Sequence, residues 1–231
     1  MLFSSLSFLC AFLPILFILY FSVKNIKIKN IILLLFSLLF YAWGEPKYIL
    51  LMLITVLISY VYGIIIEKTK NVKHKKIIFV ITVIAILLSL FIFKYLDFSI
   101  NIFNKIFSSN ISNVNLILPI GISFYTFQVL SYVIDLYKGK IKLQKNYFKL
   151  LLYVSFFPQL IAGPIVRYET IEEEIDNRRT TIEDFVYGFK RFILGLSKKI
   201  IIANNVAIIC DGIYSNYQNF GTNILWLAAI A

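Results

Sequence analysis

The sequence predicts an all-α polytopic membrane protein. Its 231 residues are 60% hydrophobic and 15% charged, and the mean hydropathy is +0.83. Water-soluble domains are roughly 45–50% apolar and about 25% charged, so a soluble domain of this size could not bury so much apolar surface. Long apolar runs separated by short loops, and an uneven distribution of lysine among those loops, point to the same fold class.

Five apolar runs are predicted to cross the membrane, because a spanning helix needs roughly 17–25 apolar residues. No basic residue precedes Lys24 and no small-residue cleavage site follows, so the first run is expected to be a retained helix rather than a signal peptide. The second run is short, and we expect it to span only with help from its flanks. The predicted spans are residues 2–23, 31–43, 48–66, 77–96 and 116–137.

The loops between these runs alternate in charge. Residues 24–30 contain three lysines, residues 67–76 contain five, and residues 138–149 contain five. The intervening loops each hold one lysine against one acid, Lys47 against Glu45 and Lys105 against Asp97. Lysine and arginine accumulate in cytoplasmic loops, so the N-terminus is predicted to lie outside. This pattern also accounts for the net charge of +11 without nucleic-acid binding.

The apolar segment 147–166 is predicted to be a broken helix that re-enters the membrane. Two prolines interrupt it, and Gly163 permits a turn. The residues that follow it carry many lysines and arginines, which places them on the cytoplasmic side again. A segment that enters the membrane and returns, over residues 153–166, reconciles these observations. Its proline positions are Pro158 and Pro164.

Downstream, Thr180-Thr-Ile-Glu183 resembles a capping box that begins a helix. Residues 182–202 then carry apolar side chains on one face and charged side chains on the other, which predicts an amphipathic helix in the membrane interface or packed on other helices. A new apolar helix begins at residue 224. Because that run has only just begun at Ala231, we expect the chain to be the N-terminal portion of a longer protein.

The last predicted span contains polar residues at membrane depth. Ser123, Gln128 and Asp135 lie within it, and Pro119 and Gly121 disturb its start. Gln128 and Asp135 are seven positions apart and therefore share one helix face. Polar groups inside a membrane usually face the interior of a helix bundle. They can serve a functional site, or they can hold neighbouring helices together.

Two long motifs carry a family resemblance: LPIGISFYTFQVLSYVIDLYKG, residues 118–139, and SFFPQLIAGPIVR, residues 155–167. At this spacing they resemble the membrane-bound O-acyltransferase (MBOAT) family, in particular the bacterial branch that contains the alginate O-acetyltransferase membrane subunit. Phe40-Tyr-Ala-Trp-Gly44, Phe93-Lys-Tyr95 and Gly195-Leu-Ser-Lys-Lys-Ile200 agree with the same family in the expected order.

The resemblance implies a multi-helix enzyme of the bacterial cytoplasmic membrane. An acyl group, usually acetyl, would pass from a cytoplasmic donor, acetyl-CoA, to hydroxyl groups of an extracytoplasmic polysaccharide. An extracytoplasmic SGNH-type acyltransferase is the implied partner, besides the lipid bilayer and the polysaccharide acceptor. No bound cofactor is implied. The family's catalytic histidine has no counterpart here, since the single histidine, His74, is expected in a solvated loop and matches no family motif.

Five residues are candidates for lining a substrate tunnel, on the basis of their positions. Gln128 and Gln159 could donate a hydrogen bond to a carbonyl oxygen, Asp135 could orient a polar partner, and Arg167 could meet a phosphate of the donor. Ser123 is the fifth candidate. No metal site or disulfide is predicted, because Cys10 and Cys210 are far apart in apolar surroundings.

Three other functions remain open from the sequence. D-alanyl transfer to teichoic acid occurs in the same family. A transporter or flippase segment would also combine broken helices with polar groups at membrane depth. A truncated reading frame without activity of its own is the third.

Overall fold

A computed structural model describes residues 3–160 and 163–230 of the protein. Within these residues the structure contains helices and no strand. The chain divides into two units, one formed by Cys10–Arg178 and the other by the first residues together with Arg179 onward. The predicted all-α membrane fold is confirmed: the helices are long, apolar and largely exposed on their outer faces.

The first helices pack as an antiparallel pair. A π-helical turn, Phe8–Phe12, leads into α1 (Leu13–Ser22), and α2 (Ile26–Gly44) returns beside it. The prediction of a short second span, 31–43, was wrong at its beginning. The Asn25 side chain accepts a hydrogen bond from the Lys27 backbone N–H, and this cap lets the helix start inside the lysine-rich turn.

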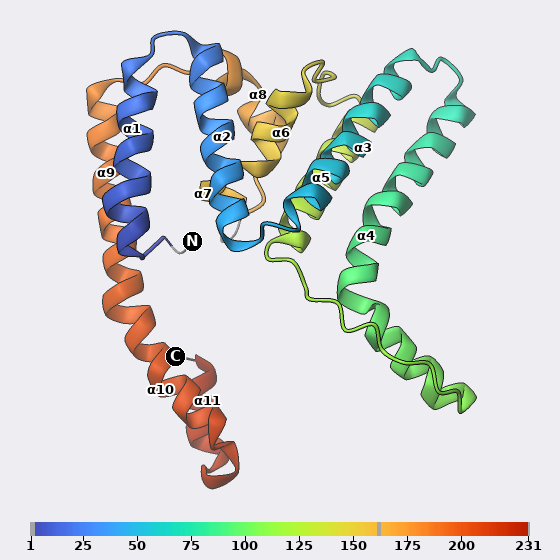
Figure 1. Ribbon diagram of the computed structural model, residues 1–231, viewed down its shortest axis with the longest axis vertical. Coiled ribbons are helices and arrows are strands. Elements are labelled where there is room, and N and C mark those ends of the chain that lie inside the picture. The colour runs from blue at the N-terminus through green and yellow to red at the C-terminus, as the bar shows by residue number, and fades with distance from the viewer. Residues whose placement is uncertain (1–2, 161–162, 231) are drawn as a thin grey trace. The chain divides into compact units, whose positions relative to one another are not determined.

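The core lies where α3 (Ile49–Lys68), α5 (Ile122–Tyr137) and α6 (Tyr147–Ser155) meet, with α4 (Val72–Phe107) against α3 and α5 (Figure 1). The α5 side chains facing this core are almost fully buried. The fully buried apolar residues at its centre are Met52, Val56, Val129, Val133, Leu150 and Val154. The core therefore includes α5, the helix that carries three of the five candidate polar residues.

The predicted span 116–137 was wrong at its beginning, because α5 starts only at Ile122. The expected disturbance by Pro119 and Gly121 is confirmed. Gly121 is the residue before the helix and has φ = +78°, a left-handed conformation that glycine adopts without strain. The Ile122 N–H donates to the Pro119 carbonyl across the turn, 3.2 Å away.

The fourth helix is longer than the predicted span 77–96. It begins at Val72, where Asn71 caps it, and continues to Phe107. His74 therefore lies in the first turn of α4 rather than in a loop, with its side chain exposed. The irregular segment 109–120 runs back along the last turns of α4 (Figure 1). Both Asp97 carboxylate oxygens hold it, accepting from the Val114 and Asn115 backbone N–H groups at 2.8 and 3.0 Å.

The segment predicted to re-enter the membrane forms a hairpin. Helix α6 ends at Ser155, the short helix α7 (Phe157–Leu160) follows, and α8 (Tyr168–Asn177) lies beside the beginning of α6 (Figure 1). Residues 161 and 162, within the predicted 153–166, lie outside the described residues. The carboxyl end of α8 returns to the end of the unit where α6 begins, since Asp176 forms an ion pair with Lys149.

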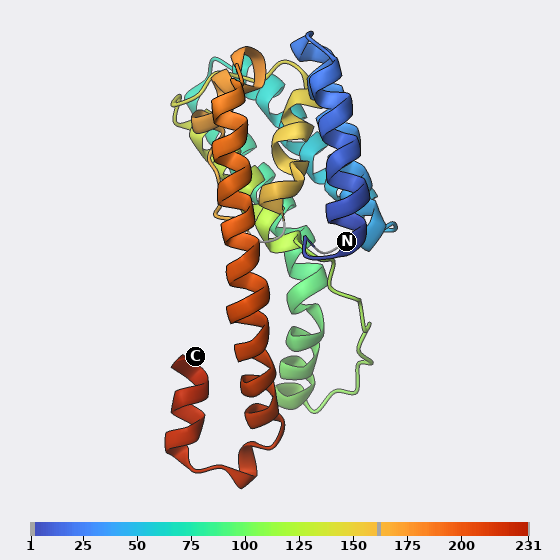
Figure 2. The same ribbon diagram turned by 90° about the vertical axis from the view of Figure 1, so that its left-hand side faces the viewer.

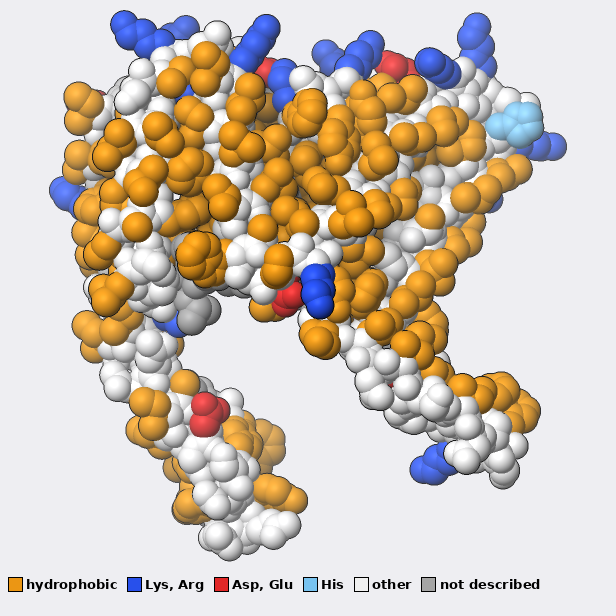
Figure 3. Space-filling view, viewed as in Figure 1, with side chains coloured by type: hydrophobic (Ala, Val, Ile, Leu, Met, Phe, Trp, Pro, Cys, Tyr) orange, Lys and Arg blue, Asp and Glu red, His pale blue; other side chains and the backbone are white. Residues whose placement is uncertain are grey.

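The lysine-rich loops gather at that same end of the first unit. The Asn30 side chain donates to the Ile175 carbonyl at 2.9 Å, and the Tyr60 hydroxyl donates to the Lys145 carbonyl at 3.0 Å. Lysine and arginine side chains line the upper rim of this unit in Figure 3. The returning limb of the hairpin and all three lysine-rich loops therefore share one end, as a re-entrant segment requires.

The second unit contains one long helical rod (Figure 2). It is formed by α9 (Ile182–Ser197), a π-helical turn at Lys198–Ala203, and α10 (Asn204–Ser215), and α11 (Thr222–Ile230) follows. The rod is thus longer than the amphipathic helix predicted over 182–202, and the helix predicted from 224 begins at Thr222. The capping box is one residue later than expected: Thr181 and Asp184 exchange the two hydrogen bonds.

Four helical stretches of the described chain are long and apolar enough to cross a membrane: Ile26–Gly44, Ile49–Lys68, Val72–Phe107 and Ile182–Ser215. The first predicted span, 2–23, corresponds to the shorter apolar helix Phe8–Ser22, and α5 has only 16 residues. Helix length and composition therefore give four candidate spans in the described chain, whereas the apolar runs of the sequence predicted five.

The re-entrant hairpin predicts which residues lie on the same side of the membrane. In a chain with Cys10 and Cys210 replaced by serine, single cysteines at Glu172 and at Lys73 should react with an impermeant maleimide from the same side. A cysteine at Asn113 should react from the other side, because the lysine-poor loop lies at the opposite end of α4. Labelling of positions 172 and 113 from one side would contradict the re-entrant hairpin.

The Asp97 contact predicts how firmly segment 109–120 is held. Asp97→Ala removes both acceptors, and we expect the Val114 and Asn115 amides to exchange with solvent at least about tenfold faster, since a lost hydrogen bond to a charged group costs roughly 1.5–3 kcal/mol. Residue-resolved hydrogen exchange measures this. Ser99→Ala is the matched control and should leave both amides unchanged. Equal exchange in the Asp97 variant would show that the contact does not hold the segment.

Candidate functional site

The break between α6 and α7 is the centre of the candidate site. If α6 continued, the Pro158 ring would collide with the Val154 carbonyl, and Pro158 has no N–H to donate to it. The chain leaves the helical conformation at Phe156, where φ is −54° and ψ is 109°. The Phe157 N–H, which would have bonded to the Tyr153 carbonyl, instead donates to the Ser37 hydroxyl of α2 at 3.3 Å. The Tyr153 carbonyl is left without its helical donor.

Two of the candidate residues supply that missing donor. The Gln128 Nε2 group donates to the Tyr153 carbonyl at 2.9 Å, and the Gln159 Nε2 group donates to the same oxygen at 2.7 Å. Gln128 is only 3% exposed. A buried carbonyl without a donor costs free energy comparable to a lost hydrogen bond. The two glutamines therefore stabilise the broken backbone.

The Tyr153 side chain closes the hairpin. Its hydroxyl donates to the Val166 carbonyl at 2.8 Å, which joins the two limbs near the limits of the predicted 153–166 segment. The Tyr168 ring packs edge-on against the Tyr153 ring and the Tyr132 ring, with centroids 5.2 Å away in both cases. Gln144 donates to the Tyr168 hydroxyl at 2.7 Å. Burial raises the pKa of Tyr168 to about 12, so the hydroxyl keeps its proton at physiological pH.

Asp135 is the buried carboxyl group of this region. It is 5% exposed, and its Oδ2 atom is enclosed without a hydrogen-bond partner among the described residues. It follows Gln128 by two helical turns and, as predicted, lies on the buried side of α5. A buried polar atom without a hydrogen bond is unfavourable. Asp135 is therefore the candidate whose Oδ2 atom is open to an additional hydrogen-bond donor.

The other two tunnel candidates do not contact the Tyr153 carbonyl. Ser123 is in the first turn of α5, about 7.5 Å along the helix axis from Gln128 at a rise of about 1.5 Å per residue. Arg167 precedes α8 and is exposed. Neither side chain makes a hydrogen bond within the part of the chain that the structure describes. The structure thus brings Gln128 and Gln159 together at one atom and leaves Ser123 and Arg167 as separate predictions.

Pro158, Gly163 and Pro164, the helix-breaking residues of the motif at residues 155–167, have different surroundings. Pro158 lies in the first turn of α7, where its missing N–H removes no helical bond. A Cβ atom on Gly163 would lie 2.9 Å from the Gln159 Cα atom, so a side chain there would collide with the backbone of α7. Pro164 is exposed in the extended segment before α8. Gly163 is therefore required by close packing next to the glutamine that caps Tyr153.

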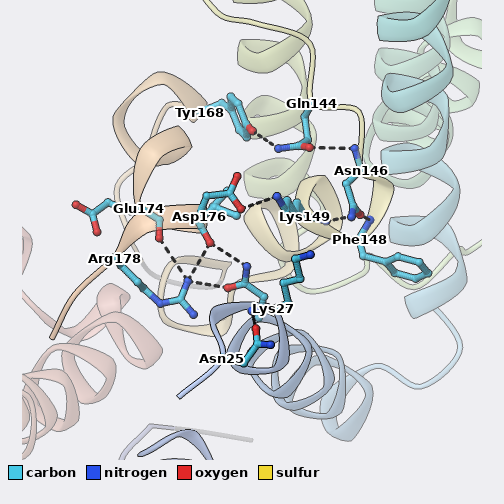
Figure 4. A network of polar contacts seen from close by, with 12 residues as sticks. Asn25, Lys27, Gln144, Asn146, Phe148, Lys149, Tyr168, Glu174, Asp176 and Arg178 are labelled. Carbon is cyan, nitrogen blue, oxygen red and sulfur yellow. Dashed lines mark hydrogen bonds and ion pairs between the residues drawn. The ribbon is translucent and has the colours of Figure 1, made fainter. Parts of the chain in front are cut away.

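A second polar network joins the end of α8 to α2 (Figure 4), and one of its hydrogen bonds reaches α1. Arg178 donates from Nε to the Tyr20 hydroxyl and from Nη1 to the Asn30 side-chain carbonyl, each at 2.7 Å. Sequence reasoning missed Arg178, because nothing in the sequence distinguishes it from Arg179. Ser37 and Asn30 were missed as well, although Ser37 is an isolated polar residue in an apolar run and could have been noticed.

No group of three or more histidine, cysteine, aspartate and glutamate side chains in the described residues could hold a metal ion. Cys10 and Cys210 are free thiols. The site is consequently built from amides, hydroxyls, one carboxyl group and backbone.

The shared carbonyl predicts a coupling between the two glutamines. Gln128→Leu or Gln159→Leu alone should lower the free energy of unfolding by about 1 kcal/mol, because one donor remains. The double variant should lose about 1 kcal/mol or more beyond the sum of the single changes, since the buried carbonyl then has no donor. Thermal unfolding in detergent measures this double-mutant cycle. Gln218→Leu, at an exposed position, is the control, and strict additivity would refute the shared contact.

Comparison with known proteins finds relatives named as O-acetylases or O-acetyltransferases that match the whole of this chain. The chain is 34% identical over 239 residues to "Probable alginate O-acetylase AlgI" of Pseudomonas aeruginosa, with all of this chain and 45% of the relative covered. It is 31% identical over 262 residues to "Peptidoglycan O-acetyltransferase" of Helicobacter pylori, with all of this chain and 50% of the relative covered. A shorter match, 33% over 91 residues, relates 38% of the chain to "Teichoic acid D-alanyltransferase" of Bacillus subtilis.

No family model matches the chain, and no solved structure matches it. The chain spans about half the length of the curated relatives that it matches along its whole length. These matches agree with the resemblance that the two long motifs predicted. Along its whole length, the chain is thus a homologue of part of the bacterial O-acetylases, as the resemblance to the membrane-bound O-acyltransferase family implied.

Proposed function

We propose that the chain belongs to the membrane subunit of a polysaccharide O-acyltransferase system in the bacterial cytoplasmic membrane. The system would move an acetyl group from a cytoplasmic donor to hydroxyl groups of an extracytoplasmic polymer. The observation that carries this proposal is the match of the whole chain to relatives named as O-acetylases of alginate and of peptidoglycan. The helical membrane architecture and the hairpin at α6–α8 support it.

The proposed donor is acetyl-CoA, approaching from the lysine-rich end of the first unit. In the transfer, the thioester C–S bond breaks and an ester C–O bond forms, and the hydroxyl proton passes through a base to the thiolate. Arg167 is exposed immediately before α8 and could meet a phosphate of the donor. The surrounding lysines would attract an anionic donor to the same face.

The described residues would guide the acyl group rather than activate it. Histidine suits the base because its pKa lies near neutrality, but the single histidine, His74, is exposed at the beginning of α4, far along the chain from both long motifs. We therefore assign the base to a group outside this chain. The hairpin would line the donor route, Asp135 would hold a polar partner inside it, and Gln128 and Gln159 would keep the broken backbone in place.

A separate extracytoplasmic acyltransferase, of the SGNH type, is the proposed partner that completes transfer to the polysaccharide. D-alanyl transfer to teichoic acid is the second candidate function, because a relative with that name matches 38% of the chain. Acetyl transfer is preferred, since the relatives named for it match the chain from end to end. The lysine-poor end of the first unit is where such a partner would approach.

Asp135 and Arg167 test this proposal in a cell that produces the complete acyltransferase. Asp135→Asn and Arg167→Ala should each reduce polymer-bound acetate at least about tenfold, because the donor route loses its buried carboxyl group or its exposed cation. Acetate released by mild alkali measures the modification, and immunoblotting checks the protein level. Glu173→Gln, an exposed change on α8, is the control. Acetylation near the wild-type level in both variants would count against the proposed route.

A further inference from the structure

The last part of α4 extends beyond the length that a membrane requires. The helix has 36 residues and is therefore about 54 Å long at a rise of about 1.5 Å per residue, whereas the hydrocarbon core of a bilayer is about 30 Å thick. Residues 77–93 contain no charged side chain, and Lys94 and Tyr95, both exposed, come directly after them. Lysine and tyrosine side chains favour the boundary between hydrocarbon and headgroups. Residues 97–107 thus lie at or beyond that boundary, and in Figure 1 the green end of α4 turns away from the direction of its first part.

The polar face of this end of α4 is covered by the chain itself. After Ser108, whose φ is +50°, segment 109–120 runs back along the helix. The Asn104 side chain donates from Nδ2 to the Ile111 carbonyl at 2.8 Å and accepts at Oδ1 from the Ile111 N–H at 3.0 Å. Asp97 is seven residues earlier and hence on the same helix face, where it accepts from two further N–H groups of the segment. The polar face is therefore used to hold the returning segment.

The opposite face of the same helix end is apolar and exposed. Its side chains recur at the spacing of one helix face, and their exposed fractions run from 43% for Ile102 to 67% for Ile106. This apolar face consists of Phe98, Ile102, Phe103, Ile106 and Phe107. Residues 97–120, named the arm below, thus keep polar groups between helix and segment and turn large apolar side chains outward. Such an arrangement fits an apolar surrounding and not bulk water.

A bilayer surface supplies that surrounding. The arm continues a helix that is long and apolar enough to span the membrane, and it begins just after Lys94 and Tyr95, so lipid headgroups are always within its reach. The returning segment is irregular, and irregular backbone exposed to lipid is not tolerated within the hydrocarbon. The headgroup layer, by contrast, contains water and polar groups for that backbone. The segment also carries exposed apolar side chains, among them Ile111, Val114 and Ile117.

We propose that the arm lies in the headgroup layer on the lysine-poor side of the membrane, with its apolar face among the upper acyl chains. Lys105, exposed next to Ile106, reaches the lipid phosphates. Because the returning segment leads into the turn at Gly121, this attachment fixes the depth at which α5 begins. The inference does not depend on acyl transfer, so it is tested separately from the proposed function.

Spin labels on single cysteines test the arm in vesicles of phosphatidylethanolamine and phosphatidylglycerol. In a chain with Cys10 and Cys210 replaced by serine, Ile102→Cys and Ile106→Cys place labels on the apolar face. Asn101→Cys, exposed four residues after Asp97 and so on the polar face, is the matched control. Power saturation compares label collisions with oxygen, which concentrates in acyl chains, and with a water-soluble nickel chelate. The oxygen-to-nickel ratio should be at least about tenfold higher at 102 and 106 than at 101, since an interfacial helix buries its apolar face about 5–10 Å deep.

Tryptophan fluorescence gives a second measurement that needs no label. In a chain with Trp43 and Trp226 replaced by phenylalanine, Ile106→Trp should be quenched at least about twofold more by lipids brominated near the headgroup end of the acyl chain than by lipids brominated near its terminal methyl group, because the apolar face is shallow. Equal quenching by the two lipids, or none, would contradict an interfacial position.

Three outcomes of the labelling would overturn the proposal. Collisions dominated by nickel at all three positions would mean that the arm projects into water. Exclusion of both reagents at positions 102 and 106 would mean that protein, either a second copy or another chain, covers the apolar face. Collisions dominated by oxygen at position 101 as well would mean that the arm is immersed in hydrocarbon and does not lie at its surface.

Discussion

The Tyr153 carbonyl is the atom on which the arrangement of the first unit depends. A helix broken at membrane depth leaves backbone groups that water cannot reach, and protein must satisfy them. Here one donor comes from α5 through Gln128 and another from α7 through Gln159. The Phe157 N–H, released by the same break, finds Ser37 on α2. The break thus joins α2, α5, α6 and α7, and the position of α5 in the core follows from it.

The same tyrosine also determines where the chain goes next. Its hydroxyl holds Val166, and the buried Tyr168 ring packs against it at the beginning of α8. The chain therefore returns to the end of the unit at which α6 began. Arg178 then attaches the end of α8 to α1 and α2. In the function proposed above, such a hairpin would bring a donor from the lysine-rich side to membrane depth without crossing the bilayer.

Several parts of this structure could be predicted from the sequence, and the errors have local physical causes. Composition and lysine distribution were enough for the helical membrane fold, and the prolines with Gly121 and Gly163 marked the two breaks. The predicted starts of α2 and α4 were wrong because the prediction counted apolar residues only. Asn25 and Asn71 cap these helices, so each helix begins within a lysine-rich turn. The glutamines were recognised as polar groups at membrane depth, but their common partner is a backbone atom that no side-chain pattern reveals.

By itself, the sequence determined the fold class, the positions of the breaks, the charged end and the resemblance to a family. These depend on composition, on proline and glycine stereochemistry and on motifs read along one chain. Only the tertiary structure showed that Gln128 and Gln159 meet at one carbonyl, that Asp135 is enclosed without a partner, and that Arg178 rather than Arg179 holds the returning limb. These facts join residues up to 158 positions apart, as between Arg178 and Tyr20. Contacts of that kind follow from how helices pack, which local sequence does not specify.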